Sequence, residues 1–553
     1  MKLLTQLKQL DVLRISALSI ALTLSLPLLV ILSSVFIADS SVWQHLAATV
    51  LPDYISSSLF LMLGVSVGTL CIGVPCAWFT SVCEFRGKKF LTWALLLPLA
   101  FPAYIIAYTY TGLLDFAGPV QSAIRQWTGL LYGEYWFFEI RSLGGAIAML
   151  TLVLYPYVYL MARAAFLAQS RNSLEVCRTL GCSRGRAFFK LSIPMARPAI
   201  ITGLTLALME TLADFGTVQF FGVNTFTTGI YRTFYGFGDA AAASQLASML
   251  LTFVAILIVL ERYSRRQNRY HSNSENNTAP ELIKLNTLHS TLVVLFCALP
   301  LALGFIIPAV VLGYWAFTQA AFEGADFLAL AWNSLYLAFA AAFIAVCLAL
   351  MLAYAKRLNT GAAVKHSISV SSMGYALPGT IIAIGIIIPL AWVDHQLIEF
   401  ATRYFEMDLG LIFSGSLFAL LFAYTVRFLA VSLGAVQDGL QKIKPNIDSA
   451  AKSLGHSNRS ILKNIHLPLM KGSVLTALLI VFVDVLKELP ATLILRPFNF
   501  NTLAVHAYEL ASDERLIDAA PASLMIVIVG IIPVILLSRS ISQAKSSTYA
   551  KGK

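Results

Sequence analysis

Charged residues are scarce in this chain. Only 12% of its 553 residues are Asp, Glu, Lys or Arg, whereas 58% are hydrophobic. Soluble domains contain about 25% charged residues. Apolar runs longer than about 18 residues recur, which is the length that a membrane-spanning helix needs. They show no alternation of period two, which argues against a transmembrane β-barrel. The composition therefore predicts an all-α polytopic membrane protein.

Cysteine and histidine are too few and too scattered to predict a metal centre. The seven cysteines fall in apolar runs or in segments expected on the inner side of the membrane, where small core residues are the favoured interpretation. The eight histidines form no HxH or HExxH pattern, and no metal-binding residues are identified. The sequence also lacks a Walker A motif, GxxxxGK[ST]. We therefore expect neither a bound cofactor nor ATP hydrolysis by this chain alone.

About twelve apolar segments are long enough to cross a membrane as helices. The first is longer than the apolar core of a signal peptide and has no clear small-x-small cleavage site, so we expect a retained anchor. The approximate bounds of the twelve are 15–37, 57–80, 91–114, 143–162, 198–218, 240–260, 288–315, 333–353, 368–392, 409–426, 472–495 and 519–538.

Basic residues are rare on one side of the predicted membrane. With the N-terminus inside, 32 of the 39 Lys and Arg residues fall in inner segments, six fall in outer loops, and Lys487 lies within a span. This asymmetry follows the positive-inside rule and predicts that both termini are cytoplasmic. Topology therefore accounts for the net charge of +11, and nucleic-acid binding is not expected.

Residues 262–287 are polar and rich in Asn and Ser, and they predict a cytoplasmic linker. The linker separates a first half, 1–261, from a second half, 288–553, each with about six spans. The cores of the halves are expected at about 54–260 and about 330–540.

The two halves match each other at a nearly constant offset along the sequence. SSLF at 57–60 faces NSLY at 333–336, and ADFGTV at 213–218 faces KELPAT at 487–492. Each half begins inside and has an even number of spans, so the repeats are parallel rather than inverted. We expect two six-helix repeats related by an axis along the membrane normal, with the path of the transported solute near that axis.

One polar motif occurs on the inner side of each half. Residues 173–194 read SLEVCRTLGCSRGRAFFKLSIP and residues 447–468 read IDSAAKSLGHSNRSILKNIHLP. The pattern predicts a short helix, a turn at Gly181 or Gly455, and a second short helix that a proline ends. A helix pair on the lipid surface is the alternative. Constant length with varying basic residues favours a docking surface for two copies of a rigid partner.

These segments resemble the coupling loop of binding-protein-dependent ABC transporter permeases, E-A-A-x-x-L-G followed by I-x-L-P. Copy one departs from the pattern by Val176-Cys177 in place of the Ala pair. In copy two, Ser449 occupies the acidic position and Asp448 precedes it. The matched coupling residues are Glu175, Cys177, Gly181 and Pro194 in copy one, and Ser449, Ala450, Ala451, Gly455 and Pro468 in copy two.

The resemblance implies a permease subunit in the bacterial inner membrane, with several partners. Its short helices would dock on a homodimeric ABC ATPase on the cytoplasmic side, a separate chain that uses ATP and Mg. A periplasmic solute-binding protein would deliver the cargo. ATP-driven closure of the ATPase dimer would swing the two halves from inward-open to outward-open.

Two acid pairs lie inside predicted spans at equivalent positions. Glu210 and Asp214 are four residues apart, as are Asp484 and Glu488, which predicts that each pair shares one helix face. Charges within a membrane are costly and face a water-filled path or a partner. A translocation path and internal ion pairing both stay open. The candidate cationic partners are Lys487, Arg427 and Arg163.

The residues after the acid pairs indicate the cargo. Gly216 and Pro490 are predicted to interrupt their helices at matching places, as functional breaks in transporters do. The run ELPATLILRPFNFNTLAVHAYELASDE at 488–514 resembles the iron(III) permeases of the ABC family. Carboxylates suit ferric iron, which is a hard cation. Related permeases for thiamine, oxyanions or phosphonates are the alternative, and the exact cargo stays open.

A proton-coupled secondary transporter is the alternative from a different class, with the four acids as relay groups. A membrane enzyme is least expected, because no nucleophile and base accompany the acids. The sequence thus predicts a transport subunit rather than an enzyme.

Overall fold

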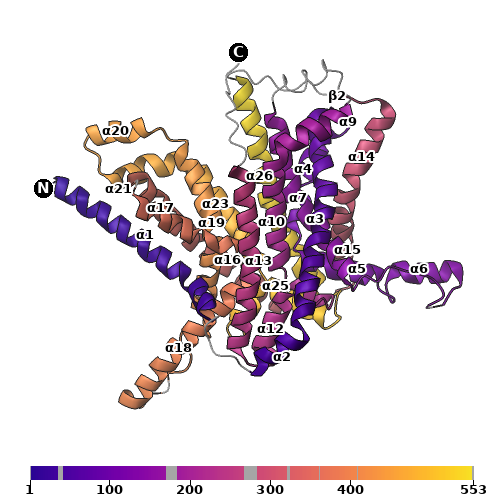
Figure 1. The fold of residues 1–553 in the computed structure, drawn as a ribbon, viewed down its shortest axis with the longest axis horizontal. Coiled ribbons are helices and arrows are strands. Elements are labelled where there is room, and N and C mark those ends of the chain that lie inside the picture. Colours follow the sequence, from indigo (N-terminus) through magenta and orange to yellow (C-terminus); the bar gives the residue numbers. More distant parts are fainter. Residues whose placement is uncertain are drawn as a thin grey trace. The chain divides into compact units, whose positions relative to one another are not determined.

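The structure is a computed structural model that describes residues 2–34, 41–131, 133–169, 184–266, 283–320, 324–359, 361–407 and 409–550. Helices dominate these residues (Figure 1). The strands among them are β1 (Cys83–Glu84) and β2 (Ile283–Lys284), which pair in parallel. The fold is all-α, as the apolar runs predict.

The helices of the first half follow the predicted spans and the segments between them. They are α1 (Lys2–Ser33), α2 (Ser41–Thr49), α3 (Leu51–Val82), α4 (Lys88–Ala94), α5 (Ala103–Leu114), α6 (Pro119–Thr128), α7 (Leu143–Ala168), α9 (Arg184–Ala187), α10 (Ile193–Ala213), α11 (Gly216–Phe220), α12 (Phe226–Gly236) and α13 (Ala240–Arg266). A 3₁₀ turn, η2 (Leu97–Ala100), precedes α5, and a π-helical turn, η3 (Phe188–Ser192), precedes α10.

The second half has helices at corresponding places. They are α14 (Thr287–Leu301), α15 (Ile307–Thr318), α16 (Gly324–Leu358), α17 (Ala362–Ser371), α18 (Gly379–Phe405), α19 (Leu417–Gln441), α20 (Pro445–Ser453), α21 (Asn458–Ile461), α22 (Leu467–Leu469), α23 (Lys471–Leu486), α24 (Pro490–Leu495), α25 (Leu503–Ser512) and α26 (Ala520–Ala550). The 3₁₀ turn η6 (Met373–Ala376) precedes α18, and π turns lie at η5 (Ala302–Ile306) and η7 (Leu462–His466).

Nine helices in the described part of the chain are long and apolar enough to cross a membrane. Two bent helix pairs pass the same test together, and each is a broken span or a re-entrant loop. They are Lys88–Ala100 with Ala103–Thr128 at 91° and Asn458–Leu469 with Lys471–Leu486 at 76°. Helix α26 also has a shorter apolar stretch, Ala520–Leu536. Each of the twelve predicted segments overlaps one of these helices or bent pairs.

Contacts group the helices into two compact units that do not follow the two halves of the sequence. Unit 1 comprises Met1–Gln44, Ile230–Ser248 and Phe322–His506. Unit 2 comprises His45–Gly229, Met249–Ala321 and Ala507–Lys553. In unit 1, α1 packs against α16, α17 and α18. In unit 2, α14 packs against α3, and α15 packs against α5 and α26. Each unit therefore takes helices from both halves.

Two serine caps explain where equivalent spans begin. Ser142 accepts a hydrogen bond from the N–H of Gly145 at the start of α7, and Ser416 accepts one from Phe418 at the start of α19. A serine at this position satisfies a backbone donor that the helix leaves unpaired. Ser142 and Ser416 are separated by the same offset as Gly181 and Gly455, so the caps belong to the sequence repeat.

A buried carboxylate fixes the loop that leads into α19. Asp394, on α18, is fully buried and accepts hydrogen bonds from the N–H groups of Ile412, Phe413 and Ser414. The Ser414 hydroxyl donates to it as well, at 2.6 Å. These hydrogen bonds replace the water that the carboxylate loses on burial, as a buried charge requires.

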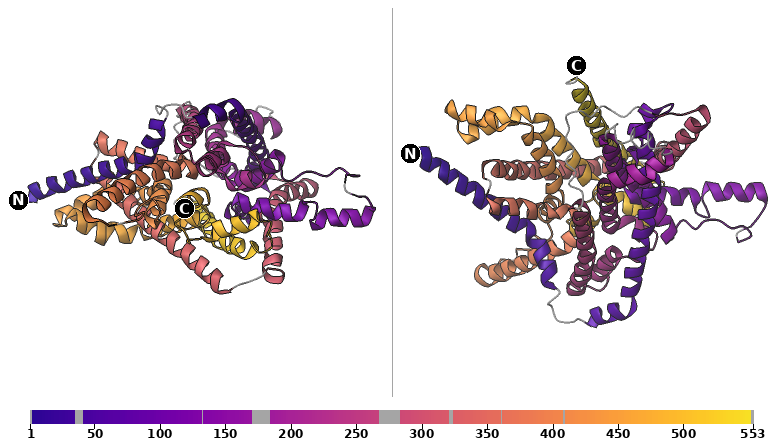
Figure 2. Two further views of the ribbon diagram at one scale, coloured as in Figure 1. Left: turned by 90° about the horizontal axis from the view of Figure 1, so that it is seen from below. Right: turned by 45° about the horizontal axis from the view of Figure 1, so that its top comes forward.

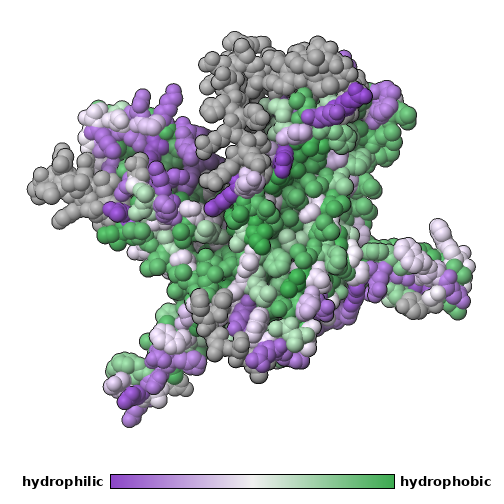
Figure 3. Space-filling view, viewed as in Figure 1, coloured by the Kyte–Doolittle hydropathy of each residue, from purple (hydrophilic) through white to green (hydrophobic). Residues whose placement is uncertain are grey.

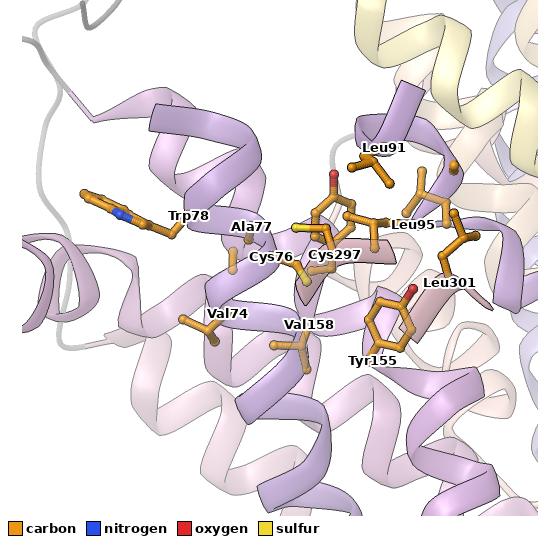
Figure 4. Packing of buried hydrophobic residues seen from close by; sticks show 14 of the residues in the cluster. Val74, Cys76, Ala77, Trp78, Leu91, Leu95, Tyr155, Val158, Cys297 and Leu301 are labelled. Atoms are coloured by element: carbon orange, nitrogen blue, oxygen red, sulfur yellow. The ribbon is translucent and has the colours of Figure 1, made fainter. Parts of the chain in front are cut away.

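Unit 2 has an apolar core built from α3, α4, α7 and α14. Trp78, Tyr155 and Leu95 are buried in it. Figure 4 shows Leu95 and Tyr155 on one side of Cys76 and Cys297, whereas Trp78 points to the other side. Cys76 on α3 and Cys297 on α14 are fully buried, and their thiols are hydrogen-bonded. These two cysteines are thus core residues, as the sequence indicates.

The surface of the spans suits contact with lipid. On α3, Leu59, Phe60, Leu63 and Val67 are each about half exposed. Figure 3 shows hydrophobic surface along the helices of unit 2. One helix, α6, extends away from the remaining helices of its unit in Figure 1 and in both views of Figure 2.

The predicted linker at 262–287 is partly regular structure. Helix α13 continues through Arg266, because no helix-breaking residue ends it at the membrane boundary. At the other end, Ile283 pairs with Cys83 and Lys284 pairs with Glu84. Residues 267–282 lie outside the described residues. Residues 262–266 thus continue helix α13 and residues 283–284 form β2, while the role of 262–287 as a linker stays a prediction.

Candidate coupling and translocation sites

The second polar motif forms a short helix on unit 1. Helix α20 begins with Pro445 in its first turn and ends before Leu454. Gly455 has a φ of +86°, the left-handed region that suits glycine. Its N–H donates to Lys452 O, and His456 N–H donates to Ala451 O. This is a Schellman motif, and it confirms the predicted turn at Gly455.

Helix α20 has a buried side and an exposed apolar side. Ala451 is buried. Ile447, Ala450 and Leu454 are exposed, and Leu454 is 80% exposed. Residues spaced three and four apart share a helix face. The helix therefore presents an apolar stripe outward, together with the exposed Ser449.

The first polar motif falls largely outside the described residues. Glu175, Cys177 and Gly181 belong to residues 170–183, of which nothing structural is stated. Pro194 is described and lies in the first turn of α10. The predicted coupling role of these residues remains a prediction.

The prolines of both motifs do not end their helices as predicted. Pro194 and Pro468 lie inside continuous helical segments, each two residues after a π turn. A proline lacks an N–H and clashes with the carbonyl four residues earlier in an α-helix. A π turn moves the hydrogen-bond partner to the fifth residue, which relieves that clash. The chain bends instead at Met470, between α22 and α23.

Asp448 on α20 faces the body of unit 1. It accepts hydrogen bonds from Arg357 Nε at 2.7 Å and Arg357 Nη2 at 3.0 Å, and His466 Nε2 lies 2.8 Å from it. Burial alone would raise the pKa of Asp448, but the hydrogen bonds from Arg357 and His466 outweigh it and hold that pKa below its usual range. The acid next to the motif's acidic position thus anchors the helix.

The first broken span is capped by an acid. Helix α10 ends at Ala213 and α11 begins at Gly216. Asp214 lies in the break and accepts hydrogen bonds from Thr217 Oγ1 at 3.0 Å and Val218 N–H at 3.1 Å. A carboxylate at the N-terminus of a helix satisfies its unpaired donors and its dipole.

The second broken span repeats this arrangement. Helix α23 ends at Leu486, and Pro490 begins α24. Glu488 accepts hydrogen bonds from Ala491 N–H at 3.0 Å and Thr492 N–H at 3.1 Å, and from Thr492 Oγ1 at 2.7 Å. Arg427 Nη1 donates to it at 3.1 Å. Gly216 and Pro490 therefore mark matching breaks, each as the first residue of the helix that follows.

The two acids of each pair do not share a regular helix. Glu210 lies on α10 and Asp484 lies on α23, whereas Asp214 and Glu488 follow the helix ends. The prediction of one shared helix face is wrong, because the unpaired N–H groups of the next helix hold the second acid. Asp484 forms an ion pair with Lys487 at 2.9 Å, and both side chains are partly exposed.

Sequence reasoning found some of these partners and missed others. Arg427 and Lys487 were candidate cations, and each pairs with an acid. Thr217 and Thr492, which follow the acids by three and four residues and donate to them, were missed. Arg357 was missed because no local pattern links it to Asp448, which lies far from it in the sequence.

The described residues contain no group of three or more His, Cys, Asp or Glu side chains placed to hold a metal ion. Near the second broken span, the rings of Tyr231 and Tyr235 lie with centroids 5.0 Å apart. The Tyr235 hydroxyl donates to Ile494 O at 2.9 Å. This hydrogen bond holds Tyr235 against the backbone of α24.

Comparison with known proteins identifies a matching family. Residues 12–270 and 367–545 match the family described as "Binding-protein-dependent transport system inner membrane component". The match covers most of the chain and includes both polar motifs and both broken spans.

Curated relatives differ in how much of the chain they cover. An Fe(3+)-transport system permease protein of Haemophilus influenzae is 27% identical over 534 residues, 94% of this chain and 96% of that protein. A ferric transport system permease protein of Actinobacillus pleuropneumoniae is 24% identical over 515 residues, 86% of this chain and 69% of that protein. A molybdenum transport system permease protein of Escherichia coli K12 is 24% identical over 221 residues, 38% of this chain and 93% of that protein.

Proposed function

Because this chain belongs to the family of binding-protein-dependent transport system inner membrane components, we propose that it is the permease of an ABC importer for ferric iron. It is a multi-pass inner membrane protein and a transport component rather than an enzyme.

The observation that carries the iron assignment is the extent of similarity. The iron permease of H. influenzae aligns with 94% of this chain and 96% of its own length. The molybdenum permease of E. coli aligns along 93% of its own length but only 38% of this chain. The iron permease therefore shares the length of the chain as well as part of its sequence, which supports ferric iron over molybdate.

Helix α20 is proposed to dock on the ATPase. Its exposed apolar stripe of Ile447, Ala450 and Leu454 suits a groove on a protein partner, because an amphipathic helix binds a groove through apolar residues at such spacing. Asp448 faces inward, so the outward contact of this loop is made by apolar residues and Ser449. We propose that Glu175 supplies a more polar contact in the first loop.

The remaining partners follow from the family and the sequence. An ABC ATPase homodimer that binds ATP and Mg would contact the two loops from the cytoplasm. A periplasmic binding protein would deliver iron from the other side. Both termini would lie in the cytoplasm, as the distribution of basic residues indicates.

Acids in the two broken spans are proposed to line the path. Asp214 and Glu488 cap the short helices after the breaks, so Glu210 and Asp484, one turn earlier, are the acids proposed to face passing cations. Polar groups at helix breaks within a membrane mark transport paths in several transporter classes.

A proton-driven transporter is less well supported by the site. A relay acid must gain and lose a proton easily, but Glu488 already accepts four hydrogen bonds. Protonation of this carboxylate would sacrifice the pair with Arg427 and the cap on α24. This geometry suits a fixed structural charge better than a proton carrier.

Uptake of labelled ferric iron tests the cargo. Cells with and without this gene are compared, with molybdate, thiamine, sulfate and phosphonate as competitors. We expect iron uptake to fall in the deletion strain and to be insensitive to the competitors. Unchanged iron uptake together with lost molybdate uptake would overturn the iron assignment and leave the permease assignment intact.

Copurification tests the docking face. Leu454→Asp should abolish association of the ATPase, because a charge replaces the exposed apolar residue at the end of α20. Its 80% exposure means that the fold itself should be unaffected. Lys463→Asp, an exposed position on η7, is the matched control and should retain the ATPase. Equal copurification in both variants would exclude this face as the docking site.

A further inference from the structure

Arg357 joins three elements of unit 1 through one guanidinium group. It lies in the last turn of α16 and binds Asp448 on α20 through Nε and Nη2. Its Nη1 donates to Leu440 O at 2.7 Å and its Nη2 donates to Ile443 O at 3.0 Å, at the end of α19. A guanidinium can hold such a fixed set of acceptors because its donors are planar and rigidly spaced.

The same set of contacts includes the second short helix of the coupling loop, α21 with the π turn η7. His466, on the π turn η7, is 1% exposed and binds Asp448. Tyr354 lies one turn before Arg357, and its hydroxyl donates to Asn458 O at 2.6 Å on α21. The Tyr354 ring contacts the His466 ring with centroids 5.8 Å apart. Both α20 and α21 are thus hydrogen-bonded to α16.

The first half has neutral residues at all of the equivalent positions. In the register that matches SSLF at 57–60 with NSLY at 333–336, Ser81 is the counterpart of Arg357 and Trp78 that of Tyr354. In the register that matches Gly181 with Gly455, the counterparts of Asp448 and His466 are Leu174 and Ser192. By residue type alone, the four equivalent positions of the first half could not form the same ionic contacts.

Aromatic packing joins the equivalent elements of the first half. The ring of Trp78, on α3, lies 5.3 Å from Phe166 on α7 and 4.9 Å from Phe188 on the π turn η3. Contacts between such rings involve no charge that would lose its partner if the rings separated. A buried, multiply hydrogen-bonded ion pair instead fixes both distance and direction, because separation leaves a charge without a partner.

We infer that Arg357 is a positioning residue that transmits movement of α20 to the inner ends of α16 and α19. The inference rests on the proposed docking of α20 on an ATPase. Displacement of α20 pulls on Asp448, and the guanidinium passes that force to two spans at once. Among the described residues, this contact set ties the second coupling loop to the ends of two spans.

The experiment uses the purified complex of the full chain with its ATPase in lipid vesicles, supplied with the binding protein and ferric iron. Arg357→Met retains the apolar stem and removes the guanidinium. We expect ATPase copurification and ATP hydrolysis to persist, while iron transported per ATP falls about tenfold, within the usual range of coupling between sites. Asp448→Asn should produce the same separation of transport from hydrolysis.

Three further variants define the outcome. Lys356→Met, at the neighbouring residue, removes a charge whose hydrogen bond goes to the side chain of Gln437 rather than to the coupling loop, and it should transport normally. Arg357→Lys should be intermediate, because it restores charge without the planar fork. Combining Arg357→Met with Asp448→Asn should be no worse than either change alone.

The inference is overturned if Arg357→Met transports as much iron per ATP as the unmodified chain, or if it loses the ATPase altogether, since the residue would then act on docking. If Arg357→Met does not accumulate, Asp448→Asn is tested instead. Normal iron transport per ATP, or complete loss of the ATPase, in that variant would likewise overturn the inference. An unmodified complex without ATP-dependent transport would overturn the proposed function itself.

Discussion

Glu488 is surrounded by hydrogen-bond donors, so its replacement should reduce stability more than replacement of any other acid in the broken spans. Its side chain is 2% exposed and that of Arg427 is 12% exposed. Removing one partner of a buried ion pair costs about 3–5 kcal/mol. We expect Glu488→Gln to lower the free energy of unfolding by about 3 kcal/mol, measured by denaturant titration of the purified protein in detergent.

Asp484→Asn is the matched control for this change. Asp484 and Lys487 are 18% and 31% exposed, and partly exposed pairs contribute about 0–1 kcal/mol. Similar losses of unfolding free energy in the two variants would contradict the proposed difference between the buried Glu488 cap and the partly exposed Asp484–Lys487 pair. A Glu488→Gln protein of normal stability that no longer transports iron would favour the path role for this acid.

Asp448 should make the coupling loop sensitive to acid but not to pH changes near neutrality. Its folded-state pKa is held low by Arg357 and His466, whereas an unfolded aspartate titrates near about 3.9. The stabilisation is therefore present above about pH 4 and is lost as pH falls through the lower folded-state value.

Thermal unfolding midpoints of the unmodified protein and Asp448→Asn test this linkage. The difference between the two midpoints should stay constant from about pH 8 to pH 5 and shrink below about pH 4. A difference that stays unchanged below about pH 4 would contradict this linkage.

We expect Pro468 and the π turn η7 before it to act together in coupling. Three described π turns, η3, η5 and η7, each end two residues before a proline. The turn η7 also carries His466, which binds Asp448. Each residue of an α-helix advances by about 100°, so a π turn that reverts to α-helix would rotate His466 away from its partner.

Pro468→Ala permits that reversion, because alanine restores the missing N–H. We expect stability to be unchanged or slightly higher and iron transport to fall about threefold to tenfold. Pro308→Ala is the control, since Pro308 follows η5, which is outside both coupling loops. Transport and unfolding should be measured on both variants. Equal loss of transport in both would show that the π turns act through general stability.

Element boundaries show what could be predicted from sequence and what could not. The breaks after the acid pairs were predicted from Gly216 and Pro490, and the described helices do break there. The role of Pro468 was predicted wrongly, because single-residue preferences treat proline as a helix breaker. The π turn that accommodates it depends on the whole preceding turn, and no single residue within that turn signals it.

At the scale of the whole molecule, hydropathy predicted the spans because lipid imposes one length and one composition on them. Hydropathy could not predict how spans pack, since lipid-facing and partner-facing residues are equally apolar. Unit 1 accordingly contains α1 from the first half, and unit 2 contains α14, α15 and α26 from the second. In unit 1, the backbone of Pro27 on α1 comes so close to Gly385 on α18 that a Cβ there would lie 2.5 Å from it.

This exchange of helices predicts how the two halves behave when separated. Residues 1–266 alone would leave α1 without α16, α17 and α18, and residues 283–553 alone would leave α14 without α3. We expect each half expressed by itself to be degraded or aggregated, and the two expressed together to copurify and restore iron uptake. Membrane levels and uptake in cells that carry one or both halves provide the measurement. A half that is monodisperse alone, or a pair that does not associate, would mean that each half folds on its own helices.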